Sequence, residues 1–224
     1  MTYNRSSEEL QMRELIVPEL RKRYPSARII HELPVRYSTN RIDLAAVTET
    51  EIISVEIKSS KDVIDRLEAQ LRAFQPISAR IIVALAPRWN EQLPTLKTEY
   101  EGGAIGYREQ FTETQQIIRR VGGIEIWTVD AEAGSVTVTD GDWHRARKPW
   151  LAQMLDMLHV AELIDIAHRR RVVVPMRPTH LTLVSALVDM LQGREVAADV
   201  CRALRARDAF CEGTDAPILV SEAA

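Results

Sequence analysis

Residues 41–58 have the sequence RIDLAAVTETEIISVEIK, and this stretch decides the fold. Its flanks, 41–47 and 52–58, alternate between two sets of side chains and are rich in β-branched residues, whereas residues 48–51 are all polar. Alternation on both sides of a short polar linker is typical of a β-hairpin. The stretch therefore predicts two antiparallel strands joined by a four-residue bend.

The register of this hairpin places acidic and basic side chains on one face. With the turn centred between residues 49 and 50, Asp43 lies directly across from Glu56. Side chains alternate between faces along a strand, so Lys58 lies on the same face as Glu56, one step further. The opposite face is expected to be buried, because its side chains are apolar: Ile42, Leu44, Ala46, Ile53, Val55 and Ile57.

Two carboxylates that face each other across a strand pair repel and destabilise the sheet. A divalent cation between Asp43 and Glu56 removes that repulsion, since hard cations such as Mg²⁺ bind carboxylate oxygens. The main-chain carbonyl of Ile57 is a further expected ligand. Lys58 places a positive charge beside the cation, where it holds an attacking water or neutralises charge on a phosphate. The alternative is a solvated Asp43 and an exposed Glu56–Lys58 pair on a half-buried sheet.

An Asp on one strand followed by Glu-x-Lys on the next resembles the core of the PD-(D/E)xK nuclease superfamily. Asp43, Glu56 and Lys58 carry the resemblance, which extends over about residues 6–85, and Ile stands at position 42 where the family name has Pro. The resemblance implies an α/β fold with a restriction-endonuclease-like αβββαβ core and a mixed sheet. It also implies Mg²⁺-dependent hydrolysis of phosphodiester bonds, with Mn²⁺ as a substitute.

Further site residues follow from the same resemblance. In several branches of the superfamily a Gln on the helix after Glu-x-Lys contacts metal-bound water or substrate, and Gln70 stands at that place. An acid on the first helix often adds to the metal site, for which Glu9 is the first choice and Glu14 the second. From the residues alone, Glu9 is instead the capping-box partner of Ser6. Glu32 is another acid expected on the metal face, if the connection from its strand to the hairpin is short.

The rest of the chain alternates helical and strand patterns in an order typical of an α/β fold. Helical spacing predicts helices over residues 6–24, 59–74, 109–121, 149–171, 178–191 and 194–207. Strand patterns occupy residues 27–35, 80–85, 124–129 and 135–139. Residues 86–106 contain several Pro and Gly residues and are expected to form a loop.

We therefore expect a nuclease-like domain over residues 1–145, a helical region over 146–210 and a disordered tail over 211–224. The last two helices, separated by Gln-Gly, resemble a helix-turn-helix in outline, with plain helical packing as the alternative. Residues 145–207 carry 11 basic and 6 acidic side chains, a balance compatible with contact to a phosphate backbone. The arginines expected to contact nucleic acid are Arg41, Arg66, Arg202 and Arg205.

Composition narrows the class of protein. The chain has 224 residues, 46% hydrophobic and 27% charged, with a net charge of −3, which allows a sizeable core and does not itself indicate a nucleic-acid binder. The two cysteines, Cys201 and Cys211, fit neither a zinc motif nor a disulfide framework. No apolar run reaches membrane-spanning length and no secretory signal is evident, so we expect a cytoplasmic protein.

Together these patterns predict a Mg²⁺-dependent nuclease that acts on nucleic acid, and on DNA in particular, in repair, recombination or genome defence. Its catalytic residues are expected to be Asp43, Glu56, Lys58 and Gln70. Cutting both strands would favour a homodimer, which nothing in the sequence requires. The alternative function is a catalytically inactive nucleic-acid-binding or adaptor module that keeps the nuclease fold.

Overall fold

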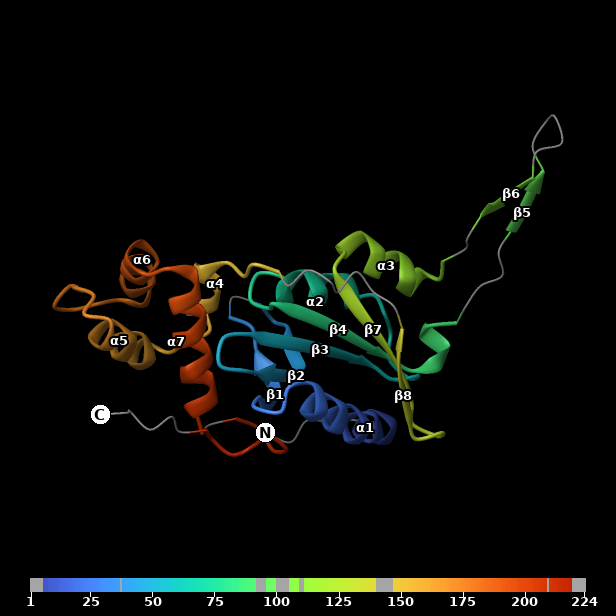
Figure 1. The fold of residues 1–224 in the computed structure, drawn as a ribbon, viewed down its shortest axis with the longest axis horizontal. Coiled ribbons are helices and arrows are strands. Elements are labelled where there is room, and N and C mark those ends of the chain that lie inside the picture. The colour runs from blue at the N-terminus through green and yellow to red at the C-terminus, as the bar shows by residue number, and fades with distance from the viewer. Residues whose placement is uncertain are drawn as a thin grey trace.

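The computed structural model describes residues 6–36, 38–91, 96–99, 105–108, 111–139, 147–208 and 210–218. It is an α/β structure with a six-stranded mixed sheet, helices on both faces and further helices after the sheet (Figure 1). The helices are α1 (Ser7–Arg23), α2 (Leu67–Phe74), α3 (Glu113–Val121), α4 (Leu151–Asp156), α5 (Val160–Arg169), α6 (His180–Met190) and α7 (Gly193–Ala206), with the 3₁₀ turn η1 (Pro87–Trp89). The strands are β1 (Arg28–Pro34), β2 (Arg41–Val47), β3 (Ile52–Lys58), β4 (Arg80–Leu85), β5 (Leu96–Glu99), β6 (Ile105–Arg108), β7 (Ile124–Asp130) and β8 (Ser135–Thr139).

The expected αβββαβ order is confirmed, as α1-β1-β2-β3-α2-β4. The strand order in the main sheet is β1-β2-β3-β4-β7-β8. The first three strands are antiparallel neighbours, β3, β4 and β7 run parallel, and β8 returns antiparallel to β7. Strands β5 and β6 form a separate antiparallel pair, within a segment for which the sequence analysis expected a loop up to residue 106.

The central hairpin has the register that the sequence predicts. Leu44 pairs with Val55, and the same register sets Asp43 opposite Glu56. Thr48 closes the bend, because its hydroxyl oxygen accepts a hydrogen bond of 2.9 Å from the main-chain N–H of Glu51. All residues of β3 are buried, so this strand lies in the middle of the sheet and is covered on both faces.

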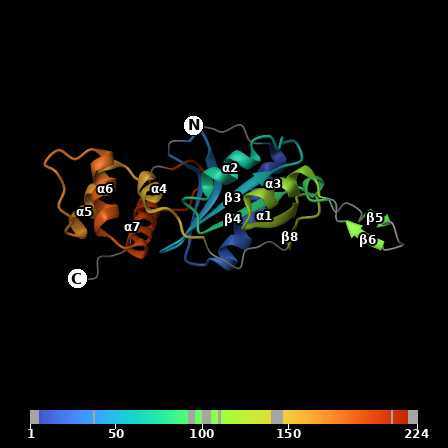
Figure 2. The same ribbon diagram turned by 90° about the horizontal axis from the view of Figure 1, so that it is seen from above.

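Helix α1 covers one face of the sheet, whereas α2 and α3 cover the other (Figures 1 and 2). On the α1 face, the buried side chains of Met12, Ile16 and Leu20 pack in one cluster with Leu44 and Val55. The cluster on the α2 face continues into α4–α7, so the core of the sheet domain and that of the helical region are contiguous. Burial of apolar surface on both sides is the main force that holds the hairpin in place.

Ile42 packs on a different face from the one predicted. It joins Ala45 and Val47 in the cluster on the α2 face, although strict alternation would place it with Leu44 on the α1 face. The alternation breaks where Glu32 of β1, opposite Asp43 in the register, has a φ of +53°. A positive φ is uncommon for a non-glycine residue. Leu33, the next residue of β1, pairs with Ile42 and packs in the same α2-face cluster.

Two helices differ in extent from the prediction. Helix α2 starts at Leu67 and not at residue 59, because Asp62 Oδ2 accepts hydrogen bonds from the main-chain N–H and the hydroxyl of Ser59, at 2.7 and 2.8 Å. Such local bonds compete with helix formation. The helix expected over residues 149–171 is divided into α4 and α5, with a second N-terminus at His159.

The tail expected to be disordered from residue 211 is ordered up to residue 218 and lies along the edge strand β1. Asp215 donates its N–H to the carbonyl of Ile29 and accepts the N–H of Ile29 on its carboxylate, both at 2.9 Å. Thr214 accepts the N–H of His31 at 3.0 Å, and the Cys211 thiol donates to the carbonyl of His31 at 3.1 Å. Residues 211–218 differ from the expected disorder because these polar residues gain partners on an exposed strand edge, which composition alone does not show, and residues 219–224 lie outside the described residues.

Candidate functional site

The predicted site residues come from three consecutive elements and converge at one end of the hairpin. Asp43 lies near the start of β2, Glu56 and Lys58 lie at the end of β3, and Gln70 lies on α2. The antiparallel register brings the two strand ends together, and the chain then returns over them as α2. The site is thus built on two strands and a helix, elements that hold side chains more firmly than loops do.

Lys58 connects two of the predicted residues, and we call Glu56, Lys58 and Gln70 the Lys58 group. The Lys58 ammonium nitrogen lies 2.6 Å from Glu56 Oε1 and 3.0 Å from Gln70 Oε1. Glu56 and Lys58 are only 1% and 5% exposed, which excludes the alternative of an exposed ion pair. The second carboxylate oxygen of Glu56, Oε2, is buried and has no hydrogen-bond partner among the described residues.

Burial and a neighbouring charge raise the pKa of Glu56 well above its usual range. Removal of the carboxylate from water is the largest cause, and the negative charge of Asp43 adds to it. The positive charge of Lys58 and its hydrogen bond act in the opposite direction without cancelling the shift. A buried oxygen without a partner is costly, so this carboxylate is ready to accept either a proton or a cation.

Asp43 is held beside Glu56 by the main chain of β3. Its Oδ2 atom accepts a hydrogen bond of 2.7 Å from the N–H of Ile57. Burial raises the pKa of Asp43 to about 6, from an ordinary value of 3.8, although the Arg13 guanidinium and the Ile57 hydrogen bond oppose the shift. The side chain is 20% exposed, so the carboxylate is accessible from solvent while its orientation is fixed.

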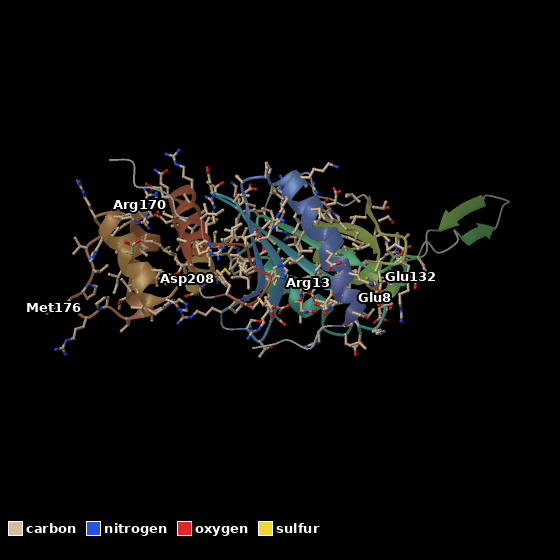
Figure 3. The ribbon with its side chains drawn as sticks, turned by 90° about the horizontal axis from the view of Figure 1, so that it is seen from below. Glu8, Arg13, Glu132, Arg170, Met176 and Asp208 are labelled. Atoms are coloured by element: carbon tan, nitrogen blue, oxygen red, sulfur yellow. The ribbon has the colours of Figure 1, made fainter. Side chains whose placement is uncertain are left out.

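Arg13 of α1 is the main site residue that the sequence analysis did not identify, and we call Glu9, Arg13, Glu32 and Asp43 the Arg13 cluster. The Arg13 side chain is only 4% exposed. Figure 3 labels it on α1, the helix that lies over the sheet in that view. It donates to Glu9 at 3.0 and 2.8 Å and to Glu32 at 2.8 Å. It also donates to the main-chain carbonyl of Asp43 at 2.7 Å and lies 3.7 Å from Asp43 Oδ1.

One sequence signal could have identified Arg13. Glu9 and Arg13 are four residues apart on the apolar flank of the helix that also carries Ile16 and Leu20, and all of these except Glu9 are buried. A charged residue in a buried stripe needs a partner, and the i,i+4 spacing supplies one. The hydroxyl of Ser6 does cap the N–H of Glu9, at 3.1 Å, but the Glu9 carboxylate binds Arg13, so only half of the expected capping box is present.

The loop after Lys58 is tied down by neighbouring elements. Glu8 of α1 accepts hydrogen bonds from the N–H and the hydroxyl of Ser60. The indole N–H of Trp89 donates to the carbonyl of Ser59 at 2.8 Å, and the Arg88 guanidinium stacks 4.2 Å over the Trp89 ring. These contacts fix the chain directly beside the Lys58 group and leave little room for movement there.

The residues present fit a divalent cation in part. Asp43 and Glu56 supply two carboxylates, one of them with a buried unpaired oxygen, and Ile57 lies between Glu56 and Lys58 with its carbonyl as the expected third ligand. Among the described residues, no group of three His, Cys, Asp or Glu side chains is arranged to hold a metal ion. Glu9 and Glu32, the two acids expected to complete the site, are both bound by Arg13.

Glu14 and the expected nucleic-acid-binding arginines lie in different environments. Glu14 is exposed on α1, outside the Arg13 cluster. Arg41 and Arg66 are exposed, and Arg202 is half-buried on α7. Arg205, also predicted as a phosphate contact, is buried at 6% exposure and donates to the carbonyl of Ser26. Its long side chain contributes instead to the packing of α7.

Comparison with known protein families gives a match to the first part of the chain. Residues 3–100 match the protein family described as Bacteriophage P4 protein cII. The first part of this chain is similar to that family. The matched range contains the Arg13 cluster and the Lys58 group, together with the hairpin that carries them. No curated protein and no solved structure matches the chain significantly.

No helix in the described ranges is both long and apolar enough to cross a membrane.

Proposed function

We propose that this protein is a metal-dependent nuclease that hydrolyses phosphodiester bonds, with DNA as its substrate. The observation that carries the proposal is the Lys58 group beside Asp43. A buried lysine is held by a glutamate and a glutamine, and a second carboxylate lies across the strand pair. The resemblance of these residues to the PD-(D/E)xK pattern supports the same chemistry.

The cation would be held by Asp43, Glu56 and the carbonyl of Ile57. A divalent cation there would polarise a phosphate oxygen and lower the pKa of a bound water. Asp43 keeps its position through the Ile57 N–H, and Glu56 keeps its position through Lys58. Both carboxylates have raised pKa values without metal, because each loses hydration on burial, and a cation would favour their ionised forms.

Lys58 and Gln70 have separate roles in this proposal. The Lys58 ammonium has three N–H donors, of which Glu56 and Gln70 each accept one. The third is available for the attacking water or for an oxygen of the phosphate on which charge builds up. Gln70 limits the rotation of the ammonium group, so that this donor keeps one direction.

The proposal is tested with the purified full-length chain, a supercoiled plasmid, circular single-stranded DNA and RNA, in Mg²⁺, Mn²⁺ or EDTA. We expect metal-dependent cleavage that falls by at least about 100-fold in Asp43→Ala and Lys58→Ala, because each removes a charge that acts in the transition state. Matched controls are Glu49→Ala, in the bend of the hairpin, and Lys61→Ala, in the loop after β3; both side chains are exposed and their removal should leave cleavage unchanged. Equal cleavage by all four variants would indicate a contaminating nuclease and refute the proposal.

A second function is a nucleic-acid-binding or adaptor module that does not cleave. The absence of a third metal-ligating side chain in the described ranges favours this alternative. Tight DNA binding without cleavage in either metal would support a nucleic-acid-binding module. Absence of both binding and cleavage would support a protein-binding adaptor.

Light scattering on the same preparation tests whether the chain forms a homodimer, which a mass near 25.4 kDa would exclude.

A further inference from the structure

Arg13 uses most of its hydrogen-bonding capacity on groups at the edge of the site. Its guanidinium donates to both Glu9 and Glu32 and to the main chain of Asp43, and its Nη1 lies 3.3 Å from the ring nitrogen Nδ1 of His31. A guanidinium keeps its positive charge in a protein interior and has five N–H donors in a fixed plane. It therefore supplies a fixed cation at a place where three carboxylates meet.

The charges of the site leave room for one divalent ion. Four carboxylates belong to the Arg13 cluster and the Lys58 group, namely Glu9, Glu32, Asp43 and Glu56, and two cations, Arg13 and Lys58, lie among them. When all of these groups are ionised, two negative charges remain. A single divalent ion balances them, whereas a second ion would leave an excess of positive charge in a poorly hydrated place.

The Arg13 guanidinium lies beside Asp43, where a second metal ion would be expected. In two-metal sites the ions lie roughly 3.5–4 Å apart and share a bridging carboxylate. Asp43 lies between the two groups: its Oδ1 is 3.7 Å from Arg13 Nη2, and its Oδ2 accepts the N–H of Ile57, the residue next to Glu56. On the opposite side, the buried Glu56 Oε2 has no partner in the described ranges, so it points to a ligand that is still to bind.

We propose that the Arg13 guanidinium takes the place of a second metal ion, so that the chain binds one divalent ion, between Asp43 and Glu56. This inference rests on the proposed function, since it concerns the metal of the same site. It also assigns Glu9 and Glu32 to Arg13 and not to the metal. Arg13 is then a positioning residue that fixes Asp43 and sets the number of ions.

The test counts Mn²⁺ ions bound to the full-length chain, by electron paramagnetic resonance of free Mn²⁺ during a titration. We expect one ion per chain for the native protein and for Arg13→Lys, which keeps the charge. For Arg13→Gln we expect two, because Glu9 and Glu32 are released. Two ions on the native chain, or one on a folded Arg13→Gln chain, would overturn the inference and leave the nuclease proposal intact. No bound ion would overturn both.

Two further variants keep the test decisive if Arg13→Gln does not fold. In Glu9→Gln and Glu32→Gln the native arginine remains, and each variant removes one acid that we assign to it. We expect both to bind one Mn²⁺ with an affinity within about threefold of the native chain, whereas removal of a ligand typically costs tenfold or more. A tenfold loss in either variant would make that acid a metal ligand and refute the assignment.

Discussion

The Arg13 cluster and the Lys58 group contain similar residues and differ in how completely their charges are matched. In the Arg13 cluster, one guanidinium contacts the side chains of Glu9, Glu32 and Asp43. In the Lys58 group, one ammonium contacts Glu56 and Gln70, and one buried oxygen of Glu56 is left without a partner in the described ranges. Every carboxylate of the first cluster lies within 3.7 Å of the guanidinium, and in this sense that cluster is complete, whereas the second is not.

The difference shows how one small region serves both stability and binding. Buried charges that are fully paired hold elements together, and here they fix α1 against β1 and β2. A buried charge that lacks a partner lowers the stability of the free protein and gives a ligand something to bind. Asp43 links the two arrangements, since it contacts Arg13 on one side and the main chain of Ile57, between Glu56 and Lys58, on the other.

The largest expected effect comes from breaking the complete cluster. Arg13→Ala should lower the free energy of unfolding by about 3–5 kcal/mol, because it leaves Glu9 and Glu32 without their buried cation. Urea unfolding followed by circular dichroism measures this loss. Lys22→Ala is the matched control, since its side chain on the same helix is 79% exposed and its removal should change stability by less than about 0.5 kcal/mol.

A smaller effect of opposite sign is expected at Asp43. Its pKa in the folded protein is about 6, above the ordinary value of 3.8, so the folded state holds its proton more tightly than the unfolded state. Its contribution to stability is full below about pH 4 and is lost as the pH rises through about 6. Asp43→Asn in EDTA should therefore be more stable than the native chain at pH 7, by up to about 3 kcal/mol.

This gain should disappear near pH 4, where the native carboxyl group is protonated as well. Urea unfolding of both proteins at several pH values between 4 and 7 gives the comparison. A gain that does not depend on pH would show that Asp43 does not titrate in this range.

The Lys58 group can be weakened without loss of charge. Gln70→Ala removes the 3.0 Å contact to the ammonium, so Lys58 should lose its fixed direction. We expect metal-dependent cleavage to fall by about tenfold, which corresponds to one hydrogen bond to a charged group. Arg72→Ala, on the exposed side of the same helix, is the control. If both variants retain full activity, Gln70 has no role in orienting Lys58.

The smallest effect is expected at the contact between the C-terminal segment and strand β1. Asp215→Ala removes the carboxylate that accepts the Ile29 N–H and that pairs with Arg21. We expect a loss of about 1 kcal/mol and faster amide hydrogen exchange at Ile29, since one hydrogen bond to a charged group is lost. Glu212→Ala, an exposed neighbour, should have no such effect. Unchanged exchange at Ile29 would show that the contact contributes little in solution.

Much of the site could be predicted from the alternation of side chains along the two strands of the hairpin. Asp43, Glu56 and Lys58 could be placed because alternation and a four-residue bend leave one favourable register, and that register is the one observed. Gln70 followed from its position on the helix after β3. These predictions needed only local geometry and the requirement that apolar faces be buried.

Other features depend on contacts between distant segments. The sequence shows Arg13 only as a polar residue on a helix flank. Its role depends on contacts with Glu32 of β1 and Asp43 of β2, which only the three-dimensional structure shows. The positive φ of Glu32 and the burial of Ile42 on the α2 face have no local sequence signal such as glycine. The late start of α2 depends on whether Asp62 binds the loop or joins the helix, which the sequence pattern does not decide.

The ordered tail has a consequence for any shortened version of this protein. Arg28 of β1 donates to the carbonyls of Leu204 and Arg205 at the end of α7, both at 3.0 Å, and residues 211–215 occupy the outer edge of the same strand. Removal of everything after residue 145 would strip this strand of its covering and leave a guanidinium without acceptors. Bare strand edges pair with one another between molecules, so such a truncated chain should aggregate, and the sheet and the helices are best expressed as one piece.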